Sequence, residues 1–191
     1  MRRTSNLIFL VALVAALGVM TNSPTAVVAV QSTVINFFLH DRLLTATNPS
    51  AFIIRPPLLA GVSDPIDPSL SIFGLAAVFD DSMTVSPEET SMEIGRGRGF
   101  YLFDQNSPGS ASEALEFSWT AEFNQASGYT PGSTLTFKGF DRITDPVREI
   151  AIVGGTRDFR LARGWAVITT YSLTGIGNAN INITAYFQYG F

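Results

Sequence analysis

The chain of 191 residues contains no cysteine and only one histidine, His40. Without cysteine, a disulfide, a thiol nucleophile and the usual cysteine and histidine zinc sites are excluded. A single histidine cannot form a metal cluster, and we expect neither a metal nor another cofactor. A catalytic serine triad would require His40, but no Gly-x-Ser-x-Gly sequence marks a nucleophile for it. We therefore expect His40 to have a structural role.

Acidic residues are absent from residues 1–29, whose pattern is that of a secretory signal peptide. Two arginines precede an apolar run over residues 7–20, and Val27 and Ala29 suit the −3 and −1 positions of a cleavage site. A membrane anchor would need about 20 apolar residues, and this run is shorter. We expect residues 1–29 to be removed and the chain to be secreted. Asn182 begins the one acceptable N-glycosylation sequon, so a glycan would be attached there.

Charge is scarce as well, because charged residues make up 15% of the chain. Acidic side chains exceed basic ones by 16 to 12, and removal of Arg2 and Arg3 would leave ten basic side chains and a net charge of −6. A mildly acidic chain has no electrostatic reason to bind nucleic acid or an anionic membrane. Residues 30–191 have the length of one domain, and a chain that is 46% hydrophobic can bury a sizeable core.

Helical periodicity is missing after residue 29, and the alternation of β-strands takes its place. Residues 115–123 alternate between apolar and polar side chains, which is typical of a half-buried antiparallel strand. The other strand-like runs cover residues 33–41, 51–54, 72–80, 93–103, 134–140, 149–153, 164–171 and 181–189. Proline and glycine turns separate them, and we take Gly154-Gly155 as one such turn. This all-β pattern indicates a sandwich or a closed barrel, and composition leaves both open.

The run over residues 70–79 is apolar on both faces, apart from Ser71. A strand in a single-layer barrel normally has one face in water, so we expect the outer face of this strand to be covered. Either a flanking loop of the same chain or a subunit interface would provide that cover.

Two aspartates fall at the ends of apolar strand faces. Because side chains alternate along a strand, Asp41 shares its face with Phe37 and Leu39, and Asp141 shares its face with Phe137. If these faces line a barrel interior, burial raises the pKa of both carboxyl groups, which suits proton donors. The three apolar side chains then become candidate substrate contacts. The alternative is that both aspartates cap turns in water.

Gly95, Gly97, Gly99 and Tyr101 share one face of another predicted strand. Three glycines in a row leave space beside the strand. That space suits close backbone packing, a bend at a barrel corner, or ligand volume beneath the Tyr101 phenol. In the last case Gly99 would contact the substrate.

Six sequence motifs occur in order between residues 37 and 164. They are FFLHD at 37–41, NPSA at 48–51, FDDSMT at 79–84, IGRGRGFY at 94–101, GSTL at 132–135 and REIAIVGGTRDFRLARG at 148–164. The last resembles the pattern REMxVVGGTGxFRxARGYA of plant dirigent proteins, and the other five resemble further motifs of that family in the family's order. Two departures are Arg98, where the family has glutamine, and Arg157, where it has a glycine and where a left-handed backbone would be strained.

The resemblance implies an eight-stranded antiparallel β-barrel like that of allene oxide cyclase, associated into homo-oligomers through the barrel walls. It also implies that Asp41, Asp141 and Tyr101 line a pocket and that Arg148 reaches toward Asp141. Such an Arg148–Asp141 pair would resist protonation of the aspartate. We therefore expect Asp41 and Asp141 to titrate as a coupled system.

The activity that the resemblance implies is stereocontrol of phenylpropanoid coupling in the apoplast, as in lignan biosynthesis. An external laccase or peroxidase would make phenoxy radicals from a monolignol such as coniferyl alcohol, and the barrel would orient two of them. Alternatively, some relatives dehydrate isoflavanols to pterocarpans through a quinone methide, with the same aspartates as acid and base. A third interpretation is a cell-wall binding or structural protein without chemistry.

Overall fold

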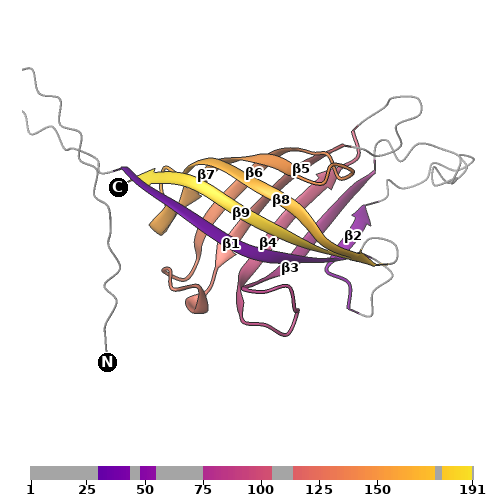
Figure 1. The fold of residues 1–191 in the computed structure, drawn as a ribbon, viewed down its shortest axis with the longest axis horizontal. Helices are drawn as coiled ribbons and strands as arrows, with labels where there is room; N and C mark the ends of the chain where they lie inside the picture. The colour runs from indigo at the N-terminus through magenta and orange to yellow at the C-terminus, as the bar shows by residue number, and fades with distance from the viewer. Residues whose placement is uncertain (1–29, 44–47, 55–74, 105–113, 175–177, 191) are drawn as a thin grey trace, which may run out of the picture.

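The computed structural model is almost entirely β-structure (Figure 1). Residues 1–29, the predicted signal peptide, lie outside the part of the chain that it describes. Within that part, no helix is long and apolar enough to cross a membrane, and no group of three or more His, Cys, Asp or Glu side chains is placed to hold a metal ion. The described residues are 30–43, 48–54, 75–104, 114–174 and 178–190.

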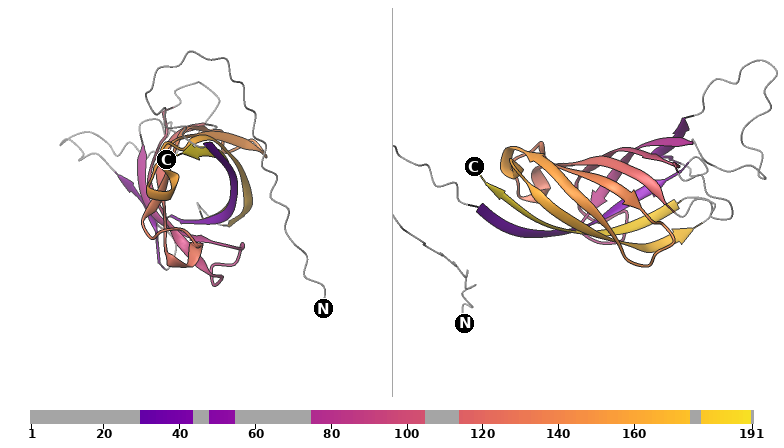
Figure 2. Two further views of the ribbon diagram at one scale, coloured as in Figure 1. Left: turned by 90° about the vertical axis from the view of Figure 1, so that its left-hand side faces the viewer. Right: turned by 90° about the horizontal axis from the view of Figure 1, so that it is seen from above.

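Nine strands make up the described fold: β1 (Val30–Arg42), β2 (Ala51–Ile54), β3 (Ala76–Thr84), β4 (Glu93–Leu102), β5 (Leu115–Phe123), β6 (Ser133–Asp141), β7 (Arg148–Thr156), β8 (Arg163–Thr174) and β9 (Asn178–Gly190). All pairings are antiparallel, in the order β1-β9-β8-β7-β6-β5-β4-β3-β2, and a further pairing of β1 with β3 closes the sheet. The short β2 pairs with the first half of β3 beside this closure. The remaining eight strands form the wall, so the predicted eight-stranded antiparallel barrel is confirmed. Figure 2 shows it end-on and from above.

β3 extends further than its sequence pattern predicted. The strand was expected to end at Asp80, but it continues to Thr84. Two adjacent aspartates and a serine resemble a turn, yet Asp81 and Met83 are buried and keep the inward alternation of the strand. This continuation provides the residues with which β3 pairs to β1 and closes the barrel.

The predicted turn at Gly154-Gly155 is wrong. Both glycines lie inside β7, which continues to Thr156. At Gly155 a Cβ would collide with the backbone of Phe159, so a glycine is needed for close packing rather than for a turn. The chain reverses after Thr156 instead, and Arg157 adopts a φ of 52°, the left-handed conformation anticipated where relatives have a glycine.

The barrel interior is filled over most of its length by aromatic and aliphatic side chains. Trp119 of β5 stacks on Phe137 of β6, with ring centroids 4.3 Å apart and planes 10° from parallel. Phe37 of β1 makes edge-to-face contacts with Trp119 and with Phe123, and the ring centroids are 6.3 Å apart in both pairs. Such tight packing is what a barrel of eight strands requires, since its interior is just wide enough for side chains to fill.

The glycines of β4 serve close packing. A Cβ at Gly99 would collide with the Ser118 carbonyl group and with Trp119, and one at Gly97 would collide with Leu39. The space beside these glycines is therefore occupied by protein, as expected from the first of the interpretations considered for this face. It is not a volume left for a ligand.

Of the apolar run over residues 70–79, residues 75–79 are described and residues 70–74 lie outside the described residues. In β3, Ala77 and Phe79 are buried inside the barrel, and Val78 on the outer face is 41% exposed. Phe52 of β2 lies directly opposite Val78 and is also exposed. The predicted cover of this outer face remains a prediction.

Candidate functional site

A cavity of about 230 Å³ opens at the end of the barrel where β1 ends and β9 begins. Asp41, Tyr101, Asp141 and Arg148 all line it. Apolar side chains make up most of the remaining wall, among them Leu43, Phe103, Leu115, Phe117, Leu173 and Ile181. The four predicted catalytic residues come from β1, β4, β6 and β7, so barrel closure brings together side chains that are far apart in sequence.

Asp41 lies near the end of β1, on the inward face that it shares with Phe37 and Leu39. Its Oδ1 atom is buried and has no hydrogen-bond partner among the described residues. Burial raises the pKa of Asp41 to about 7, and the positive charge of Arg42 opposes this rise only in part. Asp41 can therefore hold a proton near neutral pH and present it to the cavity.

Asp141 ends β6 and forms a buried ion pair with Arg148 at the start of β7. Asp141 Oδ1 and Arg148 Nε lie 2.6 Å apart, although their orientation is not that of an aligned hydrogen bond. Arg148 also donates to Thr170 Oγ1 (2.9 Å) and to the Asp145 carbonyl (3.3 Å). Burial raises the pKa of Asp141, and Arg148 opposes the rise by favouring the carboxylate. The predicted Arg148–Asp141 pair is present.

Tyr101 adds a phenol to the same cavity. Its ring stacks on Phe79 with centroids 6.1 Å apart and meets the edge of Phe103 at 5.9 Å. Burial and then the nearby carboxyl groups of Asp41 and Asp81 raise the pKa of the phenol. Tyr101 thus stays protonated and can donate a hydrogen bond to a bound oxygen.

Asp81 is an inward-facing acid whose place in the site the sequence reasoning missed. Its side chain is 1% exposed, and its pKa is raised well above the usual range by burial and by the neighbouring Asp41. The charge of Asp41 thus contributes to the raised pKa of Asp81, whereas burial and Arg148 are the causes of the pKa shift of Asp141. The expected coupling of Asp41 to Asp141 remains a prediction. The alternation of Ala77, Phe79 and Asp81 on one face could have indicated the position of Asp81.

The apolar residues predicted as substrate contacts lie deeper than the cavity. Phe37, Leu39 and Phe137 are almost completely buried in the packed interior, and Gly99 lies against Trp119. None of the four lines the cavity. They support its floor, and direct contact with a substrate remains a prediction.

His40 points away from the interior but is buried at the barrel seam. Its Nε2 lies 2.7 Å from Thr84 Oγ1 and its Nδ1 lies 3.0 Å from Asn180 Oδ1. Burial lowers the pKa of His40, so the ring is neutral at neutral pH. These contacts join β1 to β9 and to the end of β3.

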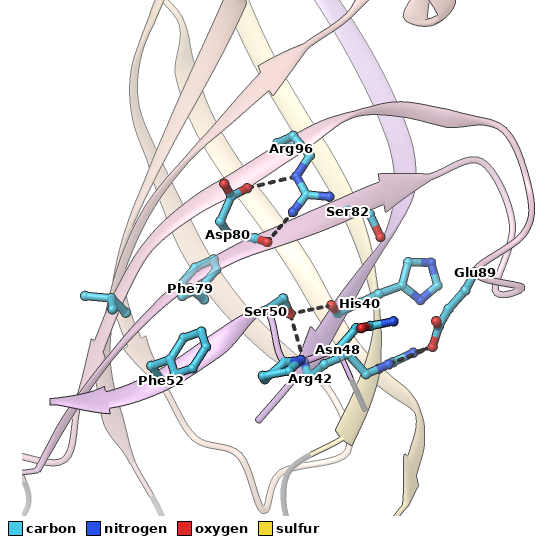
Figure 3. Close-up of a pocket in the computed structure, with 12 residues that line it drawn as sticks. His40, Arg42, Asn48, Ser50, Phe52, Phe79, Asp80, Ser82, Glu89 and Arg96 are labelled. Carbon is cyan, nitrogen blue, oxygen red and sulfur yellow. Dashed lines mark hydrogen bonds and ion pairs between the residues drawn. The ribbon is translucent and has the colours of Figure 1, made fainter. Parts of the chain in front are cut away.

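A second hollow, of about 590 Å³, lies on the outer wall between β1, β2 and β3 (Figure 3). Its charged side chains pair with one another: Arg42 binds Glu89, and Arg96 Nε lies 2.8 Å from Asp80 Oδ1. The barrel wall separates these outer charges from the inner cavity. The hollow therefore supplies none of the acids described above.

The predicted glycosylation site, Asn182, lies on the outer face of β9. Its Oδ1 accepts a hydrogen bond from Asn36 Nδ2 at 2.7 Å, and the residue is half-buried. A glycan at this position would point away from the cavity. Its attachment remains a prediction.

Comparison with known proteins identifies the family. The family model described as "Dirigent-like protein" matches residues 32–188, which include all the described strands apart from the first two residues of β1 and the last two of β9. The chain belongs to the dirigent family. Dirigent protein 1 of Arabidopsis thaliana is 31% identical over 145 residues, which cover 74% of this chain and 71% of the relative. The resemblance of the six motifs is thereby confirmed.

Relatives named for a synthase are equally similar to this dirigent chain. Pterocarpan synthase 1 of Glycine max is 35% identical over 145 residues, covering 75% of this chain and 70% of the relative. A solved structure of a pterocarpan synthase dirigent protein matches with a TM-score of 0.69 and 33% identity, covering 84% of this chain and 86% of that one. The similarity thus extends over the whole barrel.

Proposed function

We propose that this dirigent protein binds phenolic radicals or the quinone methide formed from them and directs the stereochemistry of the product. The substrate class that we favour is a monolignol such as coniferyl alcohol, oxidised by an external laccase or peroxidase. One observation carries the proposal. An acid that holds a proton near neutral pH, Asp41, faces the same apolar cavity as an arginine-bound carboxylate, Asp141.

In the coupling step, two phenoxy radicals form one carbon–carbon bond and give a bis-quinone methide, without loss or gain of electrons by the protein. The apolar wall and Tyr101 would orient the ring, which lowers the entropic cost of bringing reacting atoms together. The protein itself needs no redox group for this step, because oxidation precedes it.

In the closure step, Asp41 would protonate the quinone methide oxygen and make the benzylic carbon more electrophilic. The side-chain hydroxyl attacks that carbon, forms a carbon–oxygen bond and releases its proton to a cavity carboxylate. Asp141, whose carboxylate form the ion pair with Arg148 favours, would accept it. The step is an isomerisation of the substrate in which Asp41 loses one proton and Asp141 gains one, and transfer of a proton from Asp141 back to Asp41 would restore the starting state.

A second candidate function is dehydration and cyclisation of an isoflavanol to a pterocarpan. The similarity to pterocarpan synthases from Glycine max (35% identical) and Glycyrrhiza echinata (36% identical) favours it. The chemistry would use the same groups, because loss of water from an isoflavanol also passes through a quinone methide. The cavity would then act as an enzyme site without any oxidase.

Chiral chromatography distinguishes these functions. Coniferyl alcohol is oxidised by laccase with and without the protein, and an isoflavanol is incubated with the protein alone. The proposed function predicts an enantiomeric excess in the first reaction and no turnover in the second. Turnover of the isoflavanol without oxidase would establish the synthase alternative. A racemic product together with an unchanged isoflavanol would favour a binding or structural role.

We further propose that the protein is secreted to the apoplast, carries one glycan at Asn182 and forms a homo-oligomer through its outer wall. Large apolar side chains are exposed on that wall, among them Val34 and Trp165, which lie on neighbouring positions with Tyr186 between them. Intact mass before and after glycosidase tests the first two claims. Sedimentation tests the third, and a strict monomer at micromolar concentration would contradict it.

A further inference from the structure

A third carboxyl group faces Asp41 at the seam where the barrel closes. β1 and β3 pair through Phe38 with Thr84, Leu39 with Met83, and His40 with Ser82. One further step would place Asp41 opposite Asp81, but the ladder stops before it. Both side chains belong to the inward face of their strand. This register brings the two side chains to adjacent positions across the seam, and the charge of Asp41 raises the pKa of Asp81.

Ser50 occupies the gap that the interrupted ladder leaves. Its backbone N–H donates to the Arg42 carbonyl, and its own carbonyl accepts from Asp80 N–H, both at 2.9 Å. Its hydroxyl oxygen accepts a hydrogen bond from the backbone N–H of Arg42 at 3.1 Å. The hydroxyl donates to Asp81 Oδ1 at 2.5 Å, and the His40 carbonyl is an alternative acceptor at 3.3 Å. Figure 3 shows the hydrogen bonds of Ser50 with His40 and Arg42.

The charged groups around this carboxyl pair leave it without a direct counterion. Arg42 of β1 turns outward to Glu89, and Arg96 of β4 pairs with Asp80 on the outer wall. Among the described residues no cation lies within ion-pair distance of Asp41 or Asp81. Across the cavity, Arg148 is bound to Asp141, and Tyr101 of β4 contributes a neutral phenol.

We propose that Asp41 and Asp81 act as one acid, in which Asp81 is a positioning residue that keeps a proton on Asp41 at the cavity. Two neighbouring carboxylates in a desolvated site repel each other, so the resting pair retains one proton. The hydrogen bond from Ser50 favours the charged form of Asp81, whereas Asp41 Oδ1 has no donor and is better satisfied when protonated. Burial raises the pKa of both groups, so the pair keeps one proton at a pH where an exposed aspartate is ionised.

The chemical consequence rests on the proposed function. When Asp41 gives its proton to the quinone methide oxygen, the pair becomes a dianion whose repulsion favours recovery of a proton, and Asp141, which has taken the proton of the attacking hydroxyl, supplies it. One O–H bond forms on the phenol, one O–H bond of the alcohol breaks and one carbon–oxygen bond closes the ring. Asp81 would thus set the pH range over which Asp41 is protonated. It would not touch the substrate, because it does not line the cavity.

The test compares Asp81→Asn with Asp80→Asn in the full secreted chain. Asparagine keeps the shape of each side chain, and the amide oxygen that Asp81→Asn introduces could still accept the hydrogen bond from Ser50. Asp80 is the matched control, because it precedes Asp81 in the chain but lies on the outer wall and binds Arg96 (Figure 3). Aspartate labelled with ¹³C at the carboxyl carbon allows each group to be titrated by NMR without a substrate.

We expect Asp41 and Asp81 of the parent to titrate in two linked steps, with one step above pH 6. In Asp81→Asn, Asp41 should titrate in one step, lower by about one pH unit or more, because a facing negative charge has been removed. Asp80→Asn should leave the Asp41 curve in place. An unchanged Asp41 curve in Asp81→Asn overturns the proposal, and so does an equal shift in Asp80→Asn.

Two further measurements keep the outcome decisive. If Asp81→Asn does not fold, the NMR titration of the parent protein is the test. Independent one-step curves for Asp41 and Asp81 overturn the proposal, and linked curves support it. The pH profile of product enantiomeric excess is then measured for folded variants. If the two titration curves are linked but the alkaline limit of activity does not follow the pKa of Asp41, the carboxyl pair is established. The proposed acid role of Asp41 is then wrong.

Discussion

The two ends of the barrel interior are built by the same strands with the same alternation, yet one end is filled and the other is open. β5 passes through both: Phe123 and Trp119 are buried among other rings, whereas Phe117 lines the cavity. At the filled end the inward positions carry mainly apolar side chains, many of them aromatic. At the open end three inward positions carry aspartates.

The difference shows how the filled end determines the chemistry of the open one. The stacked rings of Trp119 and Phe137 are buried in the packed interior below the cavity. Aspartates above this packed interior lose hydration on one side, and this loss of hydration is what raises their pKa. The stability of the packed end also offsets the cost of burying Asp41, Asp81 and Asp141.

The largest effect is expected at the open end, from Asp41→Asn and Asp141→Asn. Each keeps the shape of the side chain and removes an acid or a base, which typically costs on the order of 10²–10⁴-fold in rate. The closure rate should fall by such a factor and the enantiomeric excess should be lost, at a melting temperature no lower than that of the parent. Asp80→Asn, the same change on the outer wall, should retain activity. Full activity in both inner variants would mean that the lumen carboxyl groups are structural.

At the filled end, Phe137→Ala should act on stability instead of chemistry. Removal of a fully buried ring that stacks on Trp119 leaves a cavity and should lower the free energy of unfolding by about 3–5 kcal/mol. Urea unfolding measures this loss. A stable variant with lost stereocontrol would instead make Phe137 a substrate contact.

A smaller effect concerns the free energy of unfolding that the protein loses by burying Asp41 at the open end. The pKa of folded Asp41, about 7, lies above the value of 3.8 for an exposed aspartate. The folded state therefore binds this proton more tightly, and stability falls as the pH rises from about 4 to 7. Asp41→Asn should be more stable than the parent at pH 8 by on the order of 2–4 kcal/mol, and nearly equal at pH 4. An equal difference at both pH values in urea unfolding would contradict this account.

The smallest effect is expected from Arg157→Gly, near the filled end. Arg157 adopts a φ of 52°, which a glycine adopts without strain. The substitution should raise the free energy of unfolding by about 1 kcal/mol. Product stereochemistry should not change, because this turn does not border the cavity. Thermal unfolding of the two proteins checks the gain, and a loss of stability would show that the Arg157 side chain contributes more than its backbone costs.

Much of the fold follows from local sequence patterns. Alternation over residues 115–123 predicted β5 with its observed bounds, and parity placed Asp41 and Asp141 on inward faces. These predictions succeeded because the direction of a strand side chain depends only on its position along the strand. The turn expected at Gly154 failed because glycine also serves close packing, and only the neighbouring Phe159 distinguishes the two uses.

The sequence by itself determined the strands, the faces of their side chains and the family, since each depends on residues that are close together along the chain. Only the tertiary structure decided how the strands align, and therefore that β1 closes on β3 and that the charge of Asp41 acts on Asp81. It also decided that Phe37 and Phe137 lie below the cavity while Phe117 borders it. The reason is physical: alternation specifies which face a side chain takes, whereas the depth at which it lies depends on pairing between distant strands, which no local period encodes.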